Sequence, residues 1–167
     1  MDVAALLLEL YSRIPPPAAE AVDGLTATEL VEVPAPGANS IGWLVWHSAR
    51  VADHHIAEIE DAPQIWTTGD WAERFGLAPD PHNTGYGHTP AEVAAVCPAD
   101  AAVLLDYLAA VDARTRVLLA RCTPEDLDRI VDRRWDPPVT LGVRLVSIAD
   151  DCLQHVGQAA YVRGLRR

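Results

Sequence analysis

Hydrophobic residues recur every three or four positions in four long stretches of the chain, which is the spacing of one buried helix face. We expect helices at residues 2–14, from residue 40 to just before Pro63, at 101–121 and from residue 140 to about 163. Pro15-Pro16-Pro17 is expected to end the first of them. The pattern therefore predicts four long helices, each with one apolar face.

Capping residues and breaks support these boundaries. Asn39 or Ser40 is a suitable N-cap for the second helix, and Thr140 for the fourth. The segment 62–90 contains aromatic, Gly and Pro residues, and we expect a long loop with at most one helical turn that covers part of the molecule. A brief helix is expected near residues 26–31, and residues 130–138 are expected to be extended.

No long alternating pattern of apolar and polar residues, internal repeat or low-complexity segment interrupts this arrangement. The fold class predicted is all-α, a four-helix bundle of the up-and-down type with a long loop between helices two and three. The length of 167 residues fits one domain, residues 1–167, with its own hydrophobic core.

Charge and composition narrow the classes of function. The net charge of −11 argues against binding of nucleic acid or of an anionic membrane surface. The three scattered cysteines and the absence of a basic start before the first apolar segment favour the cytoplasm. All thirteen basic residues are Arg. This excludes Schiff-base chemistry on lysine and indicates a high-GC genome, such as that of an actinobacterium.

Two polar positions on the fourth helix and one on the second are candidates for a metal site. Asp151 and His155 are four residues apart and share one helix face, and His47 borders the apolar face of the second helix. Asp150 is five residues from His155 and points elsewhere. Three such ligands could hold one divalent ion with open positions for another ligand. The alternative is that these are hydrogen-bonded structural side chains.

Other polar and aromatic residues could line a pocket or support the ligands. Trp43 could form a wall or pack in the core, and His54 could line the cavity or lie at its rim. His88 could move over the site as a proton-transfer group or make a hydrogen bond within its turn. Arg50 could pair with Asp53 in an ordinary salt bridge of small energetic weight. No catalytic residue is assigned.

The segments 39–55 and 131–165 resemble the DinB-like superfamily of metal-binding helical bundles. Within it, the stretches 39–47, 133–144 and 155–164 resemble an actinobacterial branch related to mycothiol-dependent S-transferases and to the N-terminal domain of mycothiol-dependent maleylpyruvate isomerase. The ligand positions that the resemblance implies fall on His47, Asp151 and His155. Many relatives have His or Glu at the position of Asp151. The isomerase has an additional C-terminal domain, for which we expect no counterpart in this protein, so maleylpyruvate isomerisation is not the expected activity.

The resemblance implies a metal-dependent transferase that adds a low-molecular-weight thiol to an electrophilic small molecule. Zinc is the expected ion, with nickel as the alternative, and mycothiol is the expected thiol. Two other interpretations remain open, a metal-dependent hydrolase and a non-enzymatic bundle that binds a metal or a small molecule. A homodimer is compatible with the sequence, but no helix face can be assigned to it.

Overall fold

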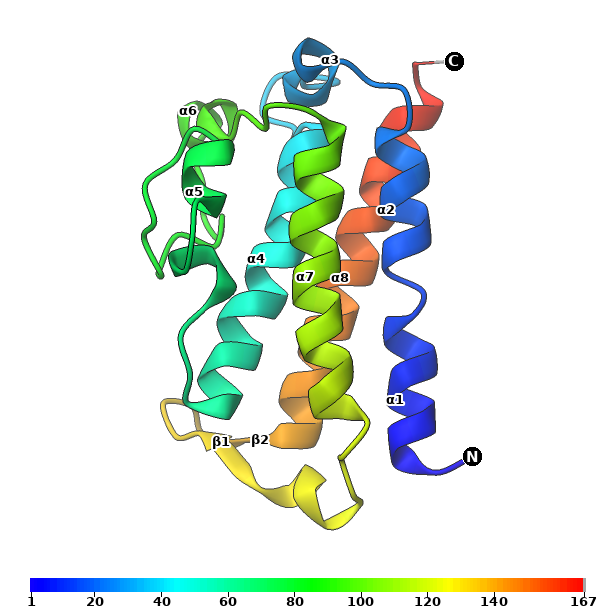
Figure 1. Cartoon of the computed structure of the whole chain (residues 1–167), viewed down its shortest axis with the longest axis vertical. Helices are drawn as coiled ribbons and strands as arrows, with labels where there is room; N and C mark the ends of the chain where they lie inside the picture. Colours follow the sequence, from blue (N-terminus) through cyan, green and yellow to red (C-terminus); the bar gives the residue numbers. More distant parts are fainter. Residues whose placement is uncertain (167) are drawn as a thin grey trace.

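The computed structural model describes residues 1–166, and its secondary structure is predominantly helical (Figure 1). The helices are α1 (Val3–Tyr11), α2 (Pro15–Val22), α3 (Ala27–Val31), α4 (Ile41–Glu60), α5 (Trp71–Arg74), α6 (Pro90–Ala95), α7 (Ala101–Leu119) and α8 (Leu141–Gly164). Two 3-10 helices, η1 (Ile65–Thr67) and η2 (Glu125–Asp128), and two short strands, β1 (Ile130–Asp132) and β2 (Val139–Thr140), complete the secondary structure.

Three long helices, α4, α7 and α8, lie side by side, and α1 followed by α2 runs along them (Figure 1). The sequence predicted one helix over residues 2–14 that ends at the prolines. Instead, α1 ends at Tyr11 and α2 begins at Pro15. Proline fits the first turn of a helix, where its missing N–H has no intrahelical acceptor to lose. The proline run therefore starts a second helix that the sequence did not predict, and the helix expected over residues 2–14 is the shorter α1.

Side-chain caps fix where the long helices begin. Ser40 Oγ accepts from the backbone N–H of Trp43 and so caps α4, and Thr140 caps α8 through the N–H of Val143. Asp100 caps α7 in the same way. Each cap satisfies a backbone donor that the first helical turn leaves unpaired. The caps expected at Ser40 and Thr140 are therefore present.

The segment between α4 and α7 contains more helix than the sequence predicted. It includes η1, α5 and α6, and it lies beside α4 (Figure 1). Trp66 of η1 is fully buried, with its ring 6.0 Å from that of Trp46 and 5.7 Å from that of Phe75. Aromatic rings bury large apolar areas, so these contacts attach the segment to the helices.

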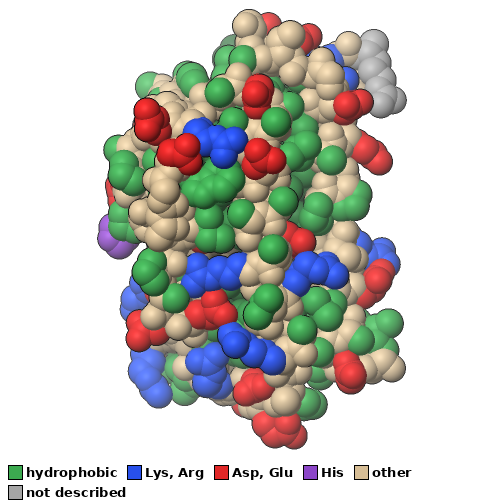
Figure 2. All heavy atoms as spheres, in the orientation of Figure 1, with side chains coloured by type: hydrophobic (Ala, Val, Ile, Leu, Met, Phe, Trp, Pro, Cys, Tyr) green, Lys and Arg blue, Asp and Glu red, His purple; other side chains and the backbone are tan. Residues whose placement is uncertain are grey.

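The strands β1 and β2 pair in an antiparallel ribbon between η2 and α8, at the same end of the molecule as the start of α8 (Figure 1). Acidic and basic side chains are interspersed on the face that Figure 2 shows. No helix within residues 1–166 combines the length and the hydrophobicity that crossing a membrane requires.

Candidate metal centre

The structure brings His47, Asp151 and His155 together between α4 and α8. The ligand atoms of the three side chains lie within 4.8 Å of one another. Asp151 Oδ2 is 3.7 Å from His47 Nε2, and Asp151 Oδ1 is 3.6 Å from His155 Nε2. His47 is almost fully buried, whereas Asp151 and His155 are partly exposed. We call these three residues the His–Asp–His group.

The remaining ring nitrogens of both histidines have their own partners. His47 Nδ1 contacts the backbone carbonyl of Thr84, and His155 Nδ1 lies 2.9 Å from Gln158 Oε1. Both partners accept hydrogen bonds, so each Nδ1 carries a proton, and in the neutral imidazole each Nε2 then offers its lone pair to the space near Asp151. This arrangement fixes the tautomer and orientation of a metal-ligating histidine.

The carboxylate of Asp151 has an unmet bonding requirement. Its buried Oδ2 has no hydrogen-bond partner among residues 1–166. Burial raises the pKa of Asp151, but the contacts with His155 and His47 outweigh it, so the pKa lies well below the ordinary value. An ionised carboxylate with an unsatisfied buried oxygen is costly unless a cation compensates it. The donors of the His–Asp–His group therefore fit a divalent metal ion such as zinc.

Gly85 allows the loop after residue 80 to approach the ligand His47 closely. Its φ is +96°, and a Cβ at this position would lie 2.7 Å from His47 Nδ1 and 3.0 Å from the rings of Trp43 and Trp46. No side chain can be accommodated there without displacing the imidazole. The close approach also lets the carbonyl of the preceding Thr84 reach the same ring.

Gly85→Ala is therefore expected to lower zinc affinity by about 10-fold or more, the effect expected when the support of a ligand is disturbed. Gly87→Ala is the matched control, because Gly87 also has a positive φ of +73° but no atom lies within 4 Å of its added Cβ. The measurement is zinc competition with a chromophoric chelator. Equal affinities of the two variants would contradict the role assigned to Gly85.

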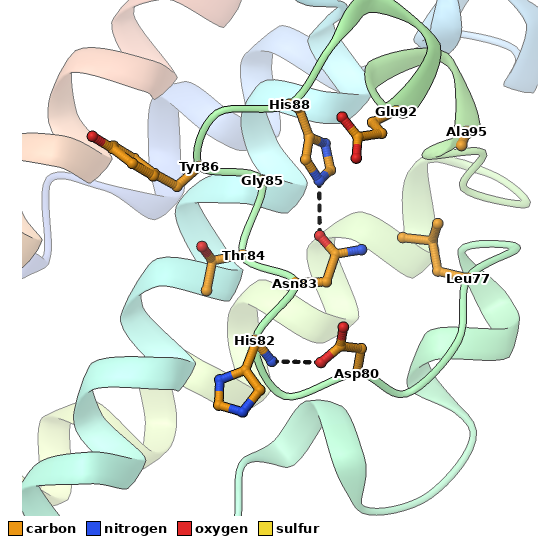
Figure 3. Close-up of a pocket in the computed structure, with 10 residues that line it drawn as sticks. All are labelled: Leu77, Asp80, His82, Asn83, Thr84, Gly85, Tyr86, His88, Glu92 and Ala95. Atoms are coloured by element: carbon orange, nitrogen blue, oxygen red, sulfur yellow. Dashed lines mark hydrogen bonds between the residues drawn. The ribbon is translucent and has the colours of Figure 1, made fainter.

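Trp43 and His88 form a wall next to the ligand His47. The indole of Trp43 stacks on the His47 ring at 4.6 Å, with planes 12° apart, and its Nε1 donates to His88 Nδ1 at 3.1 Å. His88 Nε2 in turn lies 2.8 Å from Asn83 Oδ1 (Figure 3). Both ring nitrogens of His88 are thus engaged, which favours an anchoring role for this histidine over movement across the site.

Arg50 is fully buried, and its interactions are more extensive than the ordinary salt bridge that the sequence suggested. Its Nη1 lies 3.4 Å from Asp53 Oδ2 and 3.2 Å from the hydroxyl of Tyr107, and the guanidinium lies 4.9 Å from the centre of the Trp66 ring. It also donates to Gln64 Oε1 and to the carbonyls of residues 81 and 83. The guanidinium therefore fastens the loop that contacts His47.

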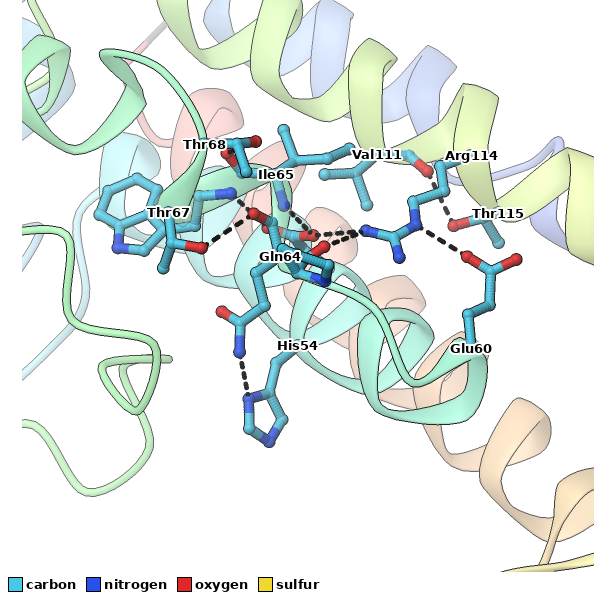
Figure 4. Close-up of polar contacts among 12 residues, drawn as sticks. His54, Glu60, Gln64, Ile65, Thr67, Thr68, Val111, Arg114 and Thr115 are labelled. Atoms are coloured by element: carbon cyan, nitrogen blue, oxygen red, sulfur yellow. Dashed lines mark hydrogen bonds and ion pairs between the residues drawn. The ribbon is translucent and has the colours of Figure 1, made fainter.

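Asp53 is the buried partner in this network. It accepts hydrogen bonds from the backbone N–H groups of Ile65 and Trp66 at 2.9 and 2.8 Å and from the hydroxyl of Tyr107 at 2.8 Å. Figure 4 shows this region, with Gln64 also reaching His54 Nδ1 at 3.1 Å. A side chain predicted to form a surface pair is instead a fully buried anion that anchors η1 to α4.

A second group of possible metal ligands among residues 1–166 consists of His54, His55 and Glu58. Its surroundings are basic. Arg134 Nη2 donates to Glu58 Oε1 at 2.7 Å, and Arg144 Nη1 lies 3.5 Å from His55 Nε2. Two adjacent guanidinium groups disfavour a bound cation. The His–Asp–His group is therefore the better candidate for a metal site.

A cleft of about 730 Å³ extends from His47 and Asp151 of the His–Asp–His group to His54 and His55 of this second group. It is lined by His47, Val51, His54, His55, His82, Thr84, Tyr86, Asp132, Arg134, Trp135, Arg144 and Asp151. The volume is in the range of small-molecule binding sites. A smaller hollow of about 330 Å³ lies around residues 80–88, Glu92 and Ala95, and no member of the His–Asp–His group lines it (Figure 3).

Comparison with known proteins agrees with this fold. The family model of the DinB superfamily matches residues 12–159, and the chain therefore belongs to the DinB superfamily. It is similar to a conserved protein from Enterococcus faecalis, whose crystal structure has 38% sequence identity and a TM-score of 0.89. That match covers 98% of this chain and 96% of the other. The search of curated proteins gave no match.

The sequence alone missed several residues that support the site. Gln158 follows His155 by three positions on the same helix, and this spacing could have identified it. The carbonyl of Thr84 and the close approach at Gly85 depend on the loop conformation and leave no such signal. Asp132 and Arg144 lie within a stretch that carried the family resemblance, but their pairing across the cleft wall was not foreseen.

Proposed function

We propose that the protein is a metal-dependent S-transferase that joins a low-molecular-weight thiol to an electrophilic small molecule. The observation that carries this proposal is the convergence of two imidazole Nε2 atoms and one carboxylate, with His47 and Asp151 of this group lining a substrate-sized cleft. Membership of the DinB superfamily supports the metal site, and the resemblance to thiol-dependent relatives supports the reaction type.

Zinc is the proposed ion, with nickel as the alternative. Two histidines and one carboxylate form a donor set that leaves a coordination position open in catalytic zinc sites. When bound, such an ion supplies positive charge that stabilises the thiolate form of a thiol, which is only partly ionised at neutral pH. The Asp ligand is shorter by one methylene than Glu, and the contacts of His47 Nδ1 with Thr84 and of His155 Nδ1 with Gln158 hold both imidazoles in place.

The chain's own residues orient and enclose the reactants. His47 is held by Thr84 and Trp43, and His155 by Gln158, so that the ligand atoms are positioned before a substrate enters. In the transfer, sulfur forms a bond to the electrophilic atom. The thiol proton passes to solvent and the leaving group departs, or in an addition the product takes up a proton.

Mycothiol is the proposed thiol, and the cytoplasm is the proposed compartment. The resemblance to the actinobacterial branch and the Arg-only composition support mycothiol as the thiol. Cys97, Cys122 and Cys152 are all free thiols, as expected in a reducing compartment, and this supports the cytoplasm. Cys152 is buried, and burial raises its pKa well above the ordinary value, which disfavours it as a nucleophile.

The test is a transfer assay with zinc-loaded protein, mycothiol and a panel of electrophiles, followed by mass spectrometry of the products. We expect product only with both metal and thiol, and a loss of about 100-fold or more in His155→Ala. Gln154→Ala is the control, because this neighbouring side chain is exposed and contacts Asp150. Turnover without thiol would indicate a hydrolase, and metal binding without any turnover would indicate a binding protein.

A further inference from the structure

The cleft has two chemically different ends. His47 and Asp151 of the His–Asp–His group line one end, and Arg134, Arg144 and His55 line the other. Helices α4 and α8 run in opposite directions and both contribute to each end (Figure 1). Asp151 and Arg144 are seven residues apart on α8, which corresponds to about 10.5 Å along the helix axis. The second end is therefore too distant to serve the metal directly.

Asp132 holds the two arginines of the second end in place. Its Oδ1 accepts from Arg134 Nε at 2.9 Å, and its Oδ2 accepts from Arg134 Nη2 at 2.9 Å and from Arg144 Nη2 at 2.7 Å. The side chain of Asp132 is only 2% exposed. The hydrogen bonds from Arg134 and the charge of Arg144 hold the pKa of Asp132 well below its usual range. The guanidinium groups are thus oriented before any ligand binds.

These interactions leave N–H donors of both arginines unused. Within residues 1–166, neither Arg134 Nη1 nor Arg144 Nε has a hydrogen-bond acceptor. Arg134 binds Glu58 as well as Asp132, whereas Arg144 shares only Asp132. Burial and the adjacent Arg144 lower the pKa of His55 to about 4, so this ring adds no charge at neutral pH. Arg144 is consequently the less compensated cation in the cleft.

Two large aromatic side chains also line the cleft without being packed. Trp135 is 65% exposed and Tyr86 is 94% exposed. Exposed aromatic residues in a cleft contribute nothing to the core, but they can cover an apolar or planar part of a ligand.

We infer that the cleft binds an electrophilic substrate that carries an anionic oxygen group, a carboxylate or a phosphate, and that Arg144 and Arg134 hold this group while its reacting atom lies near the His–Asp–His group. Arg134 Nη1 and Arg144 Nε each offer a charge-assisted hydrogen bond to such an anion. The separation of the two ends sets the length of the ligand at about 10 Å. This inference rests on the proposed function, because it places the reacting atom at the metal site.

A thiol with a carboxylate at its far end is the probe for this distance. Cobalt-substituted protein is titrated with ω-mercaptooctanoate, and the sulfur-to-cobalt charge-transfer absorption reports binding. The uncharged ω-mercaptooctanol is the matched probe, and mercaptoacetate is too short to reach Arg144. We expect the long carboxylate to bind about tenfold or more tightly than the alcohol, the gain for one charge-assisted interaction.

Arg144→Gln and Arg134→Gln are expected to remove this preference for the carboxylate, whereas Arg133→Gln is expected to keep it. Arg133 is exposed, is adjacent in sequence and does not line the cleft. The ratio of the two affinities within each variant cancels any change in cobalt binding. Equal binding of acid and alcohol by the wild-type protein would overturn the inference and leave the proposed function standing. Failure of every thiol to produce the absorption would overturn the proposed function itself.

A kinetic comparison identifies which substrate carries the anion. With a neutral thiol and a carboxylated electrophile, Arg144→Gln is expected to raise the KM of the electrophile about tenfold or more, with little change in the KM of the thiol. An increase confined to the KM of the thiol would contradict the assignment of the anion to the electrophile.

Discussion

Asp151→Asn is expected to lower zinc affinity by about 100-fold or more, because loss of a supporting residue already costs about 10–100-fold and Asp151 is proposed as a direct ligand. The variant keeps the shape of the side chain but removes the negative charge next to His47 and His155. The measurement is competition with a chromophoric chelator at neutral pH, with unfolding of the metal-free protein recorded in parallel.

Asp150→Asn is the control for this variant. It makes the same change in charge one position earlier on α8, where the side chain is exposed and contacts only Gln154. We expect its zinc affinity to equal that of the wild type. The metal-free Asp151→Asn protein is expected to unfold within about 1 kcal/mol of the wild type, because the contacts of Asp151 with His47 and His155 are long, at 3.7 and 3.6 Å, and its side chain is partly exposed. Equal zinc affinities of the two variants would contradict the proposed site.

Arg50→Ala is expected to destabilise the protein by about 3–5 kcal/mol, the cost of removing one partner of a buried ion pair. Asp53 would stay buried without its guanidinium, and the carbonyls of Pro81 and Asn83 would lose a donor. Because these residues precede the Thr84 carbonyl that contacts His47, zinc affinity is expected to fall as well. Chemical denaturation of the metal-free protein measures the first effect.

Arg13→Ala is the control for Arg50→Ala, because it removes the arginine of an exposed ion pair instead of a buried one. Arg13 and Glu9 form an ion pair at 2.7 Å on α1, and their side chains are 66% and 53% exposed. Exposed pairs of this kind contribute less than about 1 kcal/mol. If Arg50→Ala changed the free energy of unfolding no more than Arg13→Ala does, the Arg50 network would not anchor the loop.

The helical character of the chain could be predicted because it depends on local sequence patterns. Apolar spacing and the caps at Ser40 and Thr140 depend on residues three or four positions apart, and both caps are found. The break after Tyr11 was misjudged, because proline both ends one helix and starts the next. Sequence alone does not decide between these two effects of Pro15.

In the candidate site too, local spacing predicted some features, whereas contacts with distant segments could not be predicted. The pairing of Asp151 with His155 follows from helical spacing, and the apolar face of α4 directs His47 toward α8. The burial of Asp53 could not be predicted, since it depends on the N–H groups of Ile65 and Trp66 in a separate segment. Loop conformation, which sequence periodicity does not encode, also decides which carbonyl reaches His47.

X-ray absorption at the zinc edge, on protein purified without a metal-binding tag, tests the metal centre most directly. We expect stoichiometric zinc with two imidazole ligands and one carboxylate at about 2.0–2.2 Å. Addition of thiol is predicted to add a sulfur ligand at about 2.3 Å. A protein that retains no metal, or a metal whose ligand shell lacks imidazole and is unchanged in His47→Ala, would contradict the account.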